Sequence, residues 1–395
     1  MPEPDQLPVD SSIESQTVST TSRANQTEQR EHWPLKRVPQ QTAVPRSLLA
    51  SVLLTTLTIV ALAQFVAFRE PNRWVPWCMQ LYRASRGLID LTLMTGLLSQ
   101  VVIVWILLIG VGRLRPTELG LDISKLPAGV AWTFAAWLAA QLVTLLVCVV
   151  AGASISLNPE WSFGTWTQPA GQWIAQLFGN AAFEEVVDRG FLLPQCVWIA
   201  SGWFRGRSDR SRIAIALLIS QGWFALSHIP FNFAGGGWTG QWLLIFQLLM
   251  GLAFCGIYIR TGNLFLAIGF HALANNPGPL LTGGTIAETL PLAIVHLIML
   301  ALIIGRPKSL IALFCVVALG WLLARDAHTD QMAQLSKWAV LLPTPESLGE
   351  IPSKVADVLG GWEVLLIGEL HYVQDHHEFL CNCHRHGMPK ASVAS

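Results

Sequence analysis

The sequence predicts an all-α fold, a polytopic bundle of eight or nine transmembrane helices. Of its 395 residues, 52% are hydrophobic and 13% are charged, whereas a soluble domain carries roughly 25% charged residues. Apolar runs near the roughly 20 residues that cross a bilayer recur along the chain. Many of the 17 tryptophans lie close to the ends of these runs, as is typical of residues at the membrane interface.

The apolar runs give the predicted helices in chain order. Eight of them are long enough to span the membrane: 47–68, 90–112, 128–152, 171–200, 212–228, 241–259, 286–304 and 308–324. A ninth run, 263–276, is shorter, and we expect protein to surround it because lipid excludes exposed irregular backbone. The chain then divides into a polar, disordered tail (1–46), N-terminal transmembrane helices (47–152), a core with three polar motifs (153–324) and a polar C-terminal tail (325–395).

The distribution of Lys and Arg predicts that the N-terminus is cytoplasmic. With nine helices, the basic residues that follow the second, fourth, sixth and eighth helices lie on one side of the membrane. Loops 153–170, 229–240 and 277–285 face the other side and carry no Lys or Arg. Cytoplasmic loops carry an excess of these residues, which sets the orientation. The loop 69–89 departs from the pattern because its arginines lie on the opposite side.

Charge and cysteine content exclude two classes of protein. The formal net charge is zero and no basic run stands out, so we expect no nucleic-acid partner. The seven cysteines are mostly scattered singly beside or within apolar runs, which is not the pattern of a disulfide framework. The expected partner of this chain is the lipid bilayer itself.

A cluster of charges interrupts the fourth apolar run. Glu184, Glu185, Asp188 and Arg189 lie within six residues, although one charge at the bilayer centre costs roughly 2.5–3.5 kcal/mol. Glu185 and Arg189 are four residues apart on one helix face and can neutralise each other. Glu184 points about 100° away and shares its face with Asp188. A desolvated glutamate suits a general base, and a buried structural ion pair is the alternative for Glu185 and Arg189.

Two later apolar runs carry histidines. His228 follows Phe224 by four residues, and His271 precedes Asn275 by four residues on one helix face. An imidazole and a carboxamide that point the same way offer two hydrogen-bond donors with little net charge, which suits an oxyanion. Interhelical hydrogen bonding is the structural alternative for these side chains.

These residues resemble a known family. Glu-Glu-x-x-x-Arg at 184–189, Phe-x-x-x-His at 224–228 and His-x-x-x-Asn at 271–275 are similar, in this order, to the three signature motifs of the CPBP family. That family comprises CAAX-type prenyl endopeptidases, bacterial Abi proteins and lysostaphin-resistance-type membrane proteins. The resemblance covers about residues 171–304. Asp188 departs from it, because the family more usually has an apolar or aromatic residue there.

The resemblance implies an intramembrane endopeptidase that cuts a membrane-associated protein or peptide. Glu184 and His228 would activate a water molecule, and His271 with Asn275 would stabilise the oxyanion. Glu185 and Arg189 would support them. A multi-pass protein of a bacterial-type plasma membrane is expected.

The cofactor stays open at this point. Glu184, His228 and His271 could instead supply three ligands of a catalytic zinc, which would make the enzyme a metalloprotease. Asn275 beside His271 favours the metal-free glutamate mechanism, because it suits oxyanion binding better than zinc ligation.

Two other functions are compatible with some of these features. The same ionisable residues could form the relay of a transporter, or the chain could be a non-catalytic scaffold. No His-Glu-x-x-His motif lies in an apolar run, and Ser227 is too close in sequence to His228 for a serine–histidine couple. The C-terminal tail carries a cluster whose spacing matches no zinc finger: His371, His376, His377, Cys381, Cys383, His384 and His386.

Overall fold

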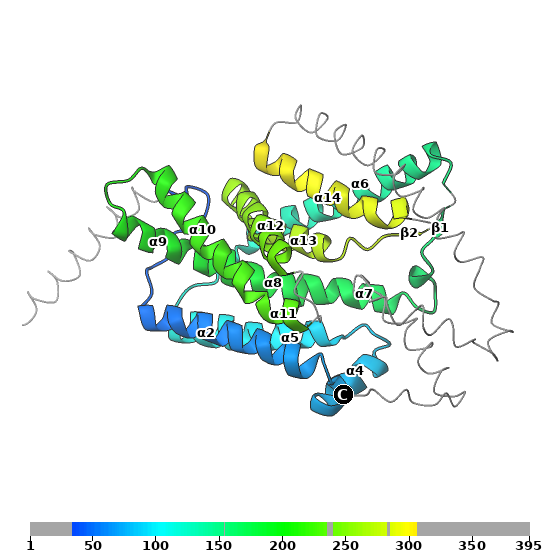
Figure 1. Cartoon of the computed structure of the whole chain (residues 1–395), viewed down its shortest axis with the longest axis horizontal. Helices are drawn as coiled ribbons and strands as arrows, with labels where there is room; N and C mark the ends of the chain where they lie inside the picture. The colour runs from blue at the N-terminus through cyan, green and yellow to red at the C-terminus, as the bar shows by residue number, and fades with distance from the viewer. Residues whose placement is uncertain (1–33, 154, 235–239, 283–284, 306–395) are drawn as a thin grey trace, which may run out of the picture. The chain divides into compact units, whose positions relative to one another are not determined.

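The computed structural model describes residues 34–153, 155–234, 240–282 and 285–305, and these residues are almost entirely helical (Figure 1). The α-helices are α2 (Arg46–Leu62), α3 (Pro71–Trp74), α4 (Pro76–Ala84), α5 (Leu91–Ser99), α6 (Leu126–Val150), α7 (Thr167–Ile174), α8 (Ala181–Glu184), α9 (Leu193–Trp203), α10 (Asp209–Ser227), α11 (Ile229–Ala234), α12 (Gly240–Thr261), α13 (Leu264–Asn275) and α14 (Thr285–Ile304). The predicted all-α fold is confirmed.

Wider and tighter helical turns join these helices. The π-helical segments are η1 (Ala63–Ala67), η2 (Gln100–Val111), η5 (Ala175–Asn180) and η6 (Glu185–Leu192), and the 3-10 turns are η3 (Ile123–Lys125) and η4 (Pro159–Trp161). The described residues form one short antiparallel sheet, in which strand β1 (Ser156–Leu157) pairs with strand β2 (Leu281–Thr282). This pair ties the start of the 153–170 loop to the segment after α13.

Six helical stretches of the described chain are long and apolar enough to cross a membrane: Arg46–Ala67, Leu91–Val111, Ile123–Val150, Asp209–Phe231, Leu243–Thr261 and Ala287–Ile304. The predicted run 171–200 lies in one continuous helix from Thr167 to Trp203, formed by α7, η5, α8, η6 and α9. We call it the 167–203 helix. The predicted run 308–324 lies outside the described residues, so the count of eight or nine helices stays a prediction.

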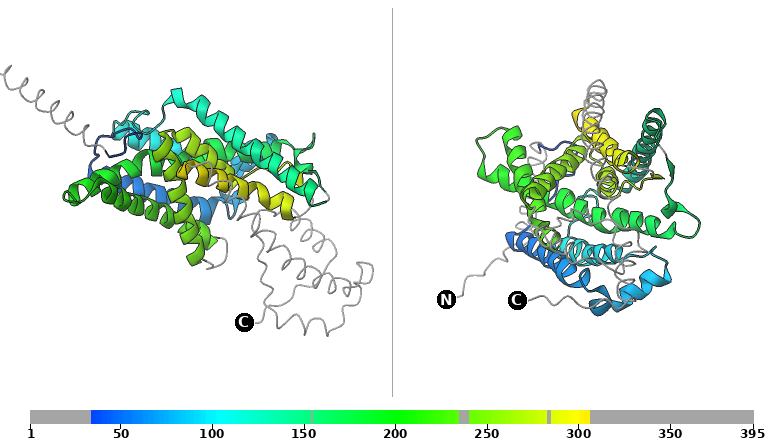
Figure 2. Two further views of the ribbon diagram at one scale, coloured as in Figure 1. Left: turned by 90° about the horizontal axis from the view of Figure 1, so that it is seen from above. Right: turned by 45° about the vertical axis from the view of Figure 1, so that its right-hand side comes forward.

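The short helix α13 is enclosed by protein, as its length required. Its 12 residues rise about 18 Å, well short of the roughly 30 Å hydrocarbon core. Leu264 and every residue from Leu266 to Leu273 are buried. The helix packs against α6, α12, α14 and the 167–203 helix, and Figure 2 shows α6 and α14 side by side.

The 167–203 helix approaches α5 through small residues. A Cβ atom added to Gly96 of α5 would lie 2.5 Å from the backbone of Gly179 in η5, so two glycines permit a backbone-to-backbone contact. Close approach at small residues is a common way in which helices associate in lipid. The N-terminal helices and the polar core therefore share one packed interior, and α5 fixes the segment that precedes Glu184.

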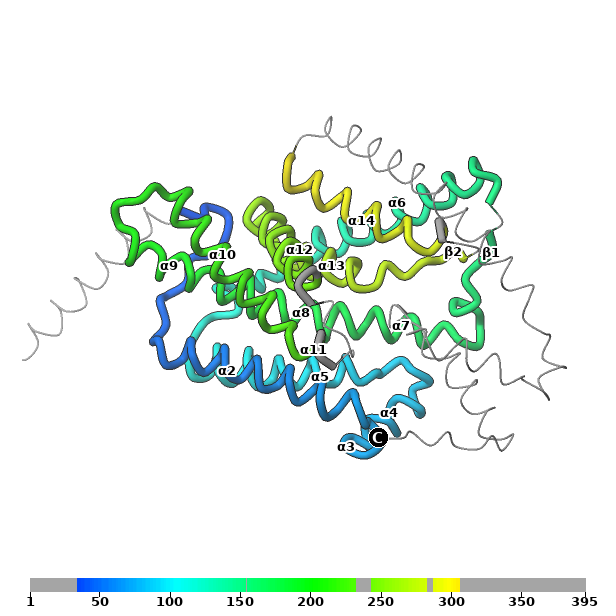
Figure 3. Tube along the Cα trace, viewed as in Figure 1, coloured from blue at the N-terminus to red at the C-terminus, as the bar shows by residue number. Residues whose placement is uncertain are grey.

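Residues 34–45 are packed, whereas their polar composition predicts that they belong to a disordered tail. Leu35 and Val38 are buried in the core, and Gln41 is buried too. The Gln41 amide donates hydrogen bonds to the carbonyls of Glu118 and Gly190. The side-chain carbonyl of Gln41 accepts a hydrogen bond from Gln195, and its backbone carbonyl accepts one from Trp198. Figure 3 shows this segment beside α9. Two apolar side chains and one buried amide fix a segment whose composition is otherwise polar.

Candidate active site

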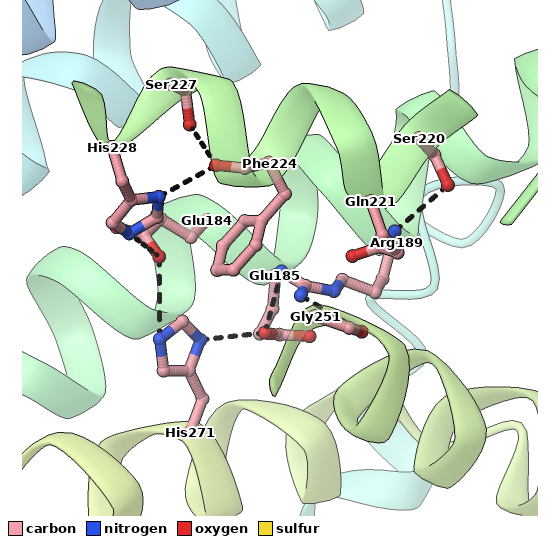
Figure 4. A network of polar contacts seen from close by, with 10 residues as sticks. All are labelled: Glu184, Glu185, Arg189, Ser220, Gln221, Phe224, Ser227, His228, Gly251 and His271. Carbon is pink, nitrogen blue, oxygen red and sulfur yellow. Dashed lines mark hydrogen bonds and ion pairs between the residues drawn. The ribbon is translucent and has the colours of Figure 1, made fainter. Parts of the chain in front are cut away.

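Three helices bring together the ionisable side chains that the sequence singled out. Glu184, at the end of α8, points its Oε2 atom towards the Nε2 atoms of two histidines (Figure 4). The distances are 3.4 Å to His271 of α13 and 3.9 Å to His228 at the end of α10. The Glu184 side chain is 16% exposed, His228 is 17% exposed and His271 is 4% exposed. The predicted grouping of Glu184, His228 and His271 in space is therefore observed.

The other nitrogen of each imidazole is already bonded. His228 Nδ1 lies 2.8 Å from the carbonyl oxygen of Phe224, and because a carbonyl only accepts, Nδ1 carries the proton. His271 Nδ1 lies 2.8 Å from Glu185 Oε1 and donates to that carboxylate in the same way. When the imidazoles are neutral, both Nε2 atoms therefore present lone pairs.

The lone pairs and a carboxylate oxygen converge on one point. Glu184 Oε2 is buried and has no hydrogen-bond partner within the described residues. A buried acceptor without a donor is costly, and three acceptors that face one another repel. A molecule that donates two hydrogen bonds, such as water, relieves this arrangement.

Glu185 and Arg189 lie on the far side of His271 from Glu184. Both side chains are fully buried, and Arg189 Nη1 lies 3.1 Å from Glu185 Oε1 as an ion pair. Arg189 Nη2 also donates to the carbonyl of Gly251 at 3.3 Å. The predicted pairing of these two charges is observed. Glu185 Oε1 therefore faces two positive or donating groups, the guanidinium and the His271 imidazole.

Two phenylalanines shape the surroundings of these charges. The Phe254 ring stacks on His271 with centroids 4.4 Å apart, and Phe224 contacts His228 edge-on at 4.6 Å. The Arg189 guanidinium lies 4.2 Å from the Phe224 centroid, a distance at which cation–π attraction operates. Phe224 was part of a sequence motif without an assigned role. Phe254 was missed, and no spacing in the sequence singles it out.

Asn275 and Asp188 lie near the site but make different contacts. Asn275 is exposed at the end of α13, one turn beyond His271, and its Nδ2 donates to Gln176 Oε1 at 2.9 Å. Asp188 is buried, and its Oδ1 has no hydrogen-bond partner among the described side chains and backbone groups. The sequence motifs do not include Gln176, and its position one turn after Gln172 on the same helix is the signal that points to it.

Glu184, His228 and His271 are the ligands of the zinc alternative that the sequence leaves open. Within the described residues, no group of three His, Cys, Asp or Glu side chains is arranged to hold a metal ion. Two ligands with zinc bonds of about 2.0–2.1 Å lie roughly 3.3 Å apart. The 3.4 Å between His271 Nε2 and Glu184 Oε2 is close to this separation, whereas the 3.9 Å between His228 Nε2 and Glu184 Oε2 exceeds it. We therefore derive no chemical step through a metal. The His- and Cys-containing cluster of the C-terminal tail lies outside the described residues.

Residues 166–276 match the family model described as Type II CAAX prenyl endopeptidase Rce1-like. The match supports the resemblance of this segment to the CPBP family of intramembrane proteases. It contains all three motifs, from Glu184 to Asn275, and covers less than a third of the 395-residue chain. Comparisons with curated proteins and with solved structures found no match. The matched family is described as a CAAX prenyl endopeptidase, which is a peptide hydrolase. With its apolar helices, the protein is an integral, multi-pass membrane protein.

Proposed function

We propose that this CPBP protease hydrolyses a peptide bond in a membrane-associated protein or peptide, with Glu184 as the general base. The observation that carries the proposal is the convergence of Glu184 Oε2 with two imidazole Nε2 atoms at 3.4 and 3.9 Å. The family match and the burial of the site support it. A buried carboxylate beside an imidazole is a common arrangement for moving a proton from water.

The nucleophile is a water molecule oriented by its own protons. One proton is donated to Glu184 Oε2 and the other to His228 Nε2, which leaves a water lone pair free for the scissile carbonyl carbon. As the oxygen–carbon bond forms, Glu184 takes the proton and the carbonyl electron pair becomes the oxyanion. When the carbon–nitrogen bond breaks, Glu184 returns the proton to the leaving amine. The sum is hydrolysis, one water for one peptide bond.

His271 donates to the oxyanion only as an imidazolium ion. Its Nδ1 proton is committed to Glu185 at 2.8 Å, so a second proton is needed at Nε2. The buried Glu185 carboxylate stabilises that positive charge, and Arg189 holds Glu185 in place. The Asn275 carboxamide supplies a second donor. In many hydrolases, preorganised donors of this kind make the largest single contribution to the rate enhancement.

The substrate and the membrane belong to the same proposal. The matched family is described as prenyl endopeptidases, so a peptide with a prenylated cysteine near its C-terminus is the first substrate to test. We retain the cytoplasmic N-terminus and the bacterial-type plasma membrane as proposals, because they rest on the distribution of Lys and Arg and on the resemblance.

The experiment is cleavage of quenched fluorescent peptides, prenylated and unprenylated, by the purified protein in nanodiscs. We expect His228→Ala to lower kcat/KM about 100- to 10,000-fold, because the group that orients the water is lost. Ser227→Ala is the matched control, since Ser227 Oγ bonds the same Phe224 carbonyl as His228 Nδ1. It should leave kcat/KM within about 3-fold of the parent, because it changes only a helix hydrogen bond.

Two results would count against this mechanism. Full activity of His228→Ala would remove the imidazole from the water site. Loss of wild-type cleavage in 1,10-phenanthroline, with recovery on added zinc, would replace the glutamate mechanism by a metalloprotease one.

A further inference from the structure

Two carboxamide pairs join the C-terminal end of α13, at Asn275 and the capping residue Asn276, to the 167–203 helix. Asn275 Nδ2 donates to Gln176 Oε1 at 2.9 Å, and Asn276 Nδ2 donates to Gln172 Oε1 at 3.3 Å. The two helices run antiparallel here, because Glu184 of the same helix contacts His271. The pairs therefore continue a line of polar contacts that begins at the candidate active site.

The alternation of α and π turns keeps this line straight. In an α-helix, a step of four residues overshoots a full turn by about 40°. A π turn takes more residues, so η5 rotates the next residues back. Gln172, Gln176 and Glu184 are spaced by four and eight residues and all reach α13. Gln176 thus faces the turn of α13 that carries Asn275, next to the turn that carries His271.

The bond to Gln176 fixes which end of the Asn275 carboxamide is available. Because Oε1 of Gln176 accepts one hydrogen of Nδ2, the second hydrogen stays free to donate. Without this acceptor, the carboxamide can rotate and present its oxygen, which repels an oxyanion. A group that orients a donor in this way contributes through geometry, as supporting residues do around other catalytic groups.

We propose that Gln176 is a positioning residue whose side-chain carbonyl holds Asn275 Nδ2 ready to donate to the oxyanion. The inference rests on the proposed role of Asn275 as an oxyanion donor. It assigns to Gln176 an effect on the rate of the chemical step rather than on substrate binding.

The neighbouring pair provides an internal comparison. Gln172 and Asn276 make the same kind of bond between the same two helices, but Asn276 Oδ1 also accepts from the backbone N–H of Gly278 at 2.9 Å. Asn276 is thus held without Gln172. If carboxamide pairs served only to join the helices, loss of either glutamine would have a similar effect.

The test measures kcat, KM and the Tm of four variants in nanodiscs with the peptide that the parent cleaves. We expect Asn275→Ala to lower kcat about 100- to 1,000-fold, as loss of an oxyanion donor does. Gln176→Met should lower kcat about 10- to 100-fold with KM within about 2-fold, a smaller effect because the donor is misplaced rather than removed. Gln172→Met should stay within about 3-fold of the parent in kcat, since Asn275 keeps its acceptor.

The double variant Asn275→Ala with Gln176→Met completes a double-mutant cycle. In the Asn275→Ala background, Gln176→Met should change kcat by less than about 2-fold, because the group it positions is gone. Gln176→Ala removes the same acceptor with a smaller side chain and gives the same result if Gln176→Met fails to purify.

The outcomes separate this inference from the proposed function. Equal losses of kcat in Gln176→Met and Gln172→Met, or an undiminished effect of Gln176→Met in the Asn275→Ala background, would overturn the positioning role alone. Unchanged kcat in Asn275→Ala would remove the oxyanion role of Asn275 and this inference with it. The proposed roles of Glu184 and His228 would still be tested separately, by Glu184→Gln and His228→Ala.

Discussion

Replacement of Glu184 by Gln lowers kcat/KM for peptide cleavage by about 100- to 10,000-fold, the range that a positioned general base contributes. The carboxamide has nearly the shape of the carboxylate but does not take a proton from water. Glu184 Oε2 has no hydrogen-bond partner within the described residues, so the change alters only its contacts with the imidazoles of His271 at 3.4 Å and His228 at 3.9 Å. We therefore expect the Tm to stay within a few degrees. Cleavage rates and thermal unfolding of the same preparation measure both effects.

Asp188→Asn is the matched control for this prediction. Asp188 lies one turn further along the same helix and is buried, with an Oδ1 atom that lacks a partner in the described chain. The change neutralises a second carboxyl group and leaves the contacts of Glu184 with His228 and His271 unaltered. We expect kcat/KM to stay within about 3-fold of the parent, because Asp188 moves no proton in the proposed reaction. Equal losses in the two variants would show that total charge, rather than one base, governs the rate.

Replacement of Arg189 by Met destabilises the protein by about 3–5 kcal/mol, because it leaves Glu185 buried without its cation. Both side chains are fully buried, and the guanidinium also bonds the Gly251 carbonyl. A loss of this size is a large part of the roughly 5–15 kcal/mol that stabilises a typical protein. The measurement is thermal or denaturant unfolding in detergent. The exposed pair of Arg73 and Glu70 is the control, and Arg73→Met should change stability little.

The double variant Arg189→Met with Glu185→Gln tests the physical reason for that loss. It removes both charges, and buried pairs replaced as a whole are often neutral in stability. The carboxamide introduced by Glu185→Gln would keep an oxygen near His271 Nδ1 without a negative charge. We expect the double variant to be more stable than Arg189→Met alone. A double variant that is no more stable would show that the guanidinium acts through packing on Phe224 rather than by pairing with Glu185.

The local part of the site could be predicted from the sequence, because helix spacing decides it. Residues four apart share a face, so the ion pair of Glu185 and Arg189 and the divergence of Glu184 followed from the numbering. The hydrogen bond from His271 to Glu185 could not be predicted in this way. It depends on how α13 crosses the 167–203 helix, and no spacing within one helix contains that information. The same holds for Phe254 and Gln176.

The helices themselves were predictable where hydropathy alone determines them. Six predicted apolar runs correspond to membrane-length helices of the described chain, and α13 is enclosed as its shortness required. The π segments on either side of Glu184 were not predicted, because a π turn reflects hydrogen bonding that composition does not specify. Residues 34–45 were assigned to a tail on polar composition, whereas the buried contacts of Leu35, Val38 and Gln41 hold them.

The most direct test of the central claim is the fate of the oxygen atom of water. The purified protein is incubated with a membrane-anchored reporter in water enriched in ¹⁸O, and the fragments are analysed by mass spectrometry. Hydrolysis by an activated water predicts one cut, with one ¹⁸O atom in the new C-terminal carboxyl group, and no cut with Glu184→Gln. A new carboxyl group without the label, or equal cleavage by Glu184→Gln, would contradict the account.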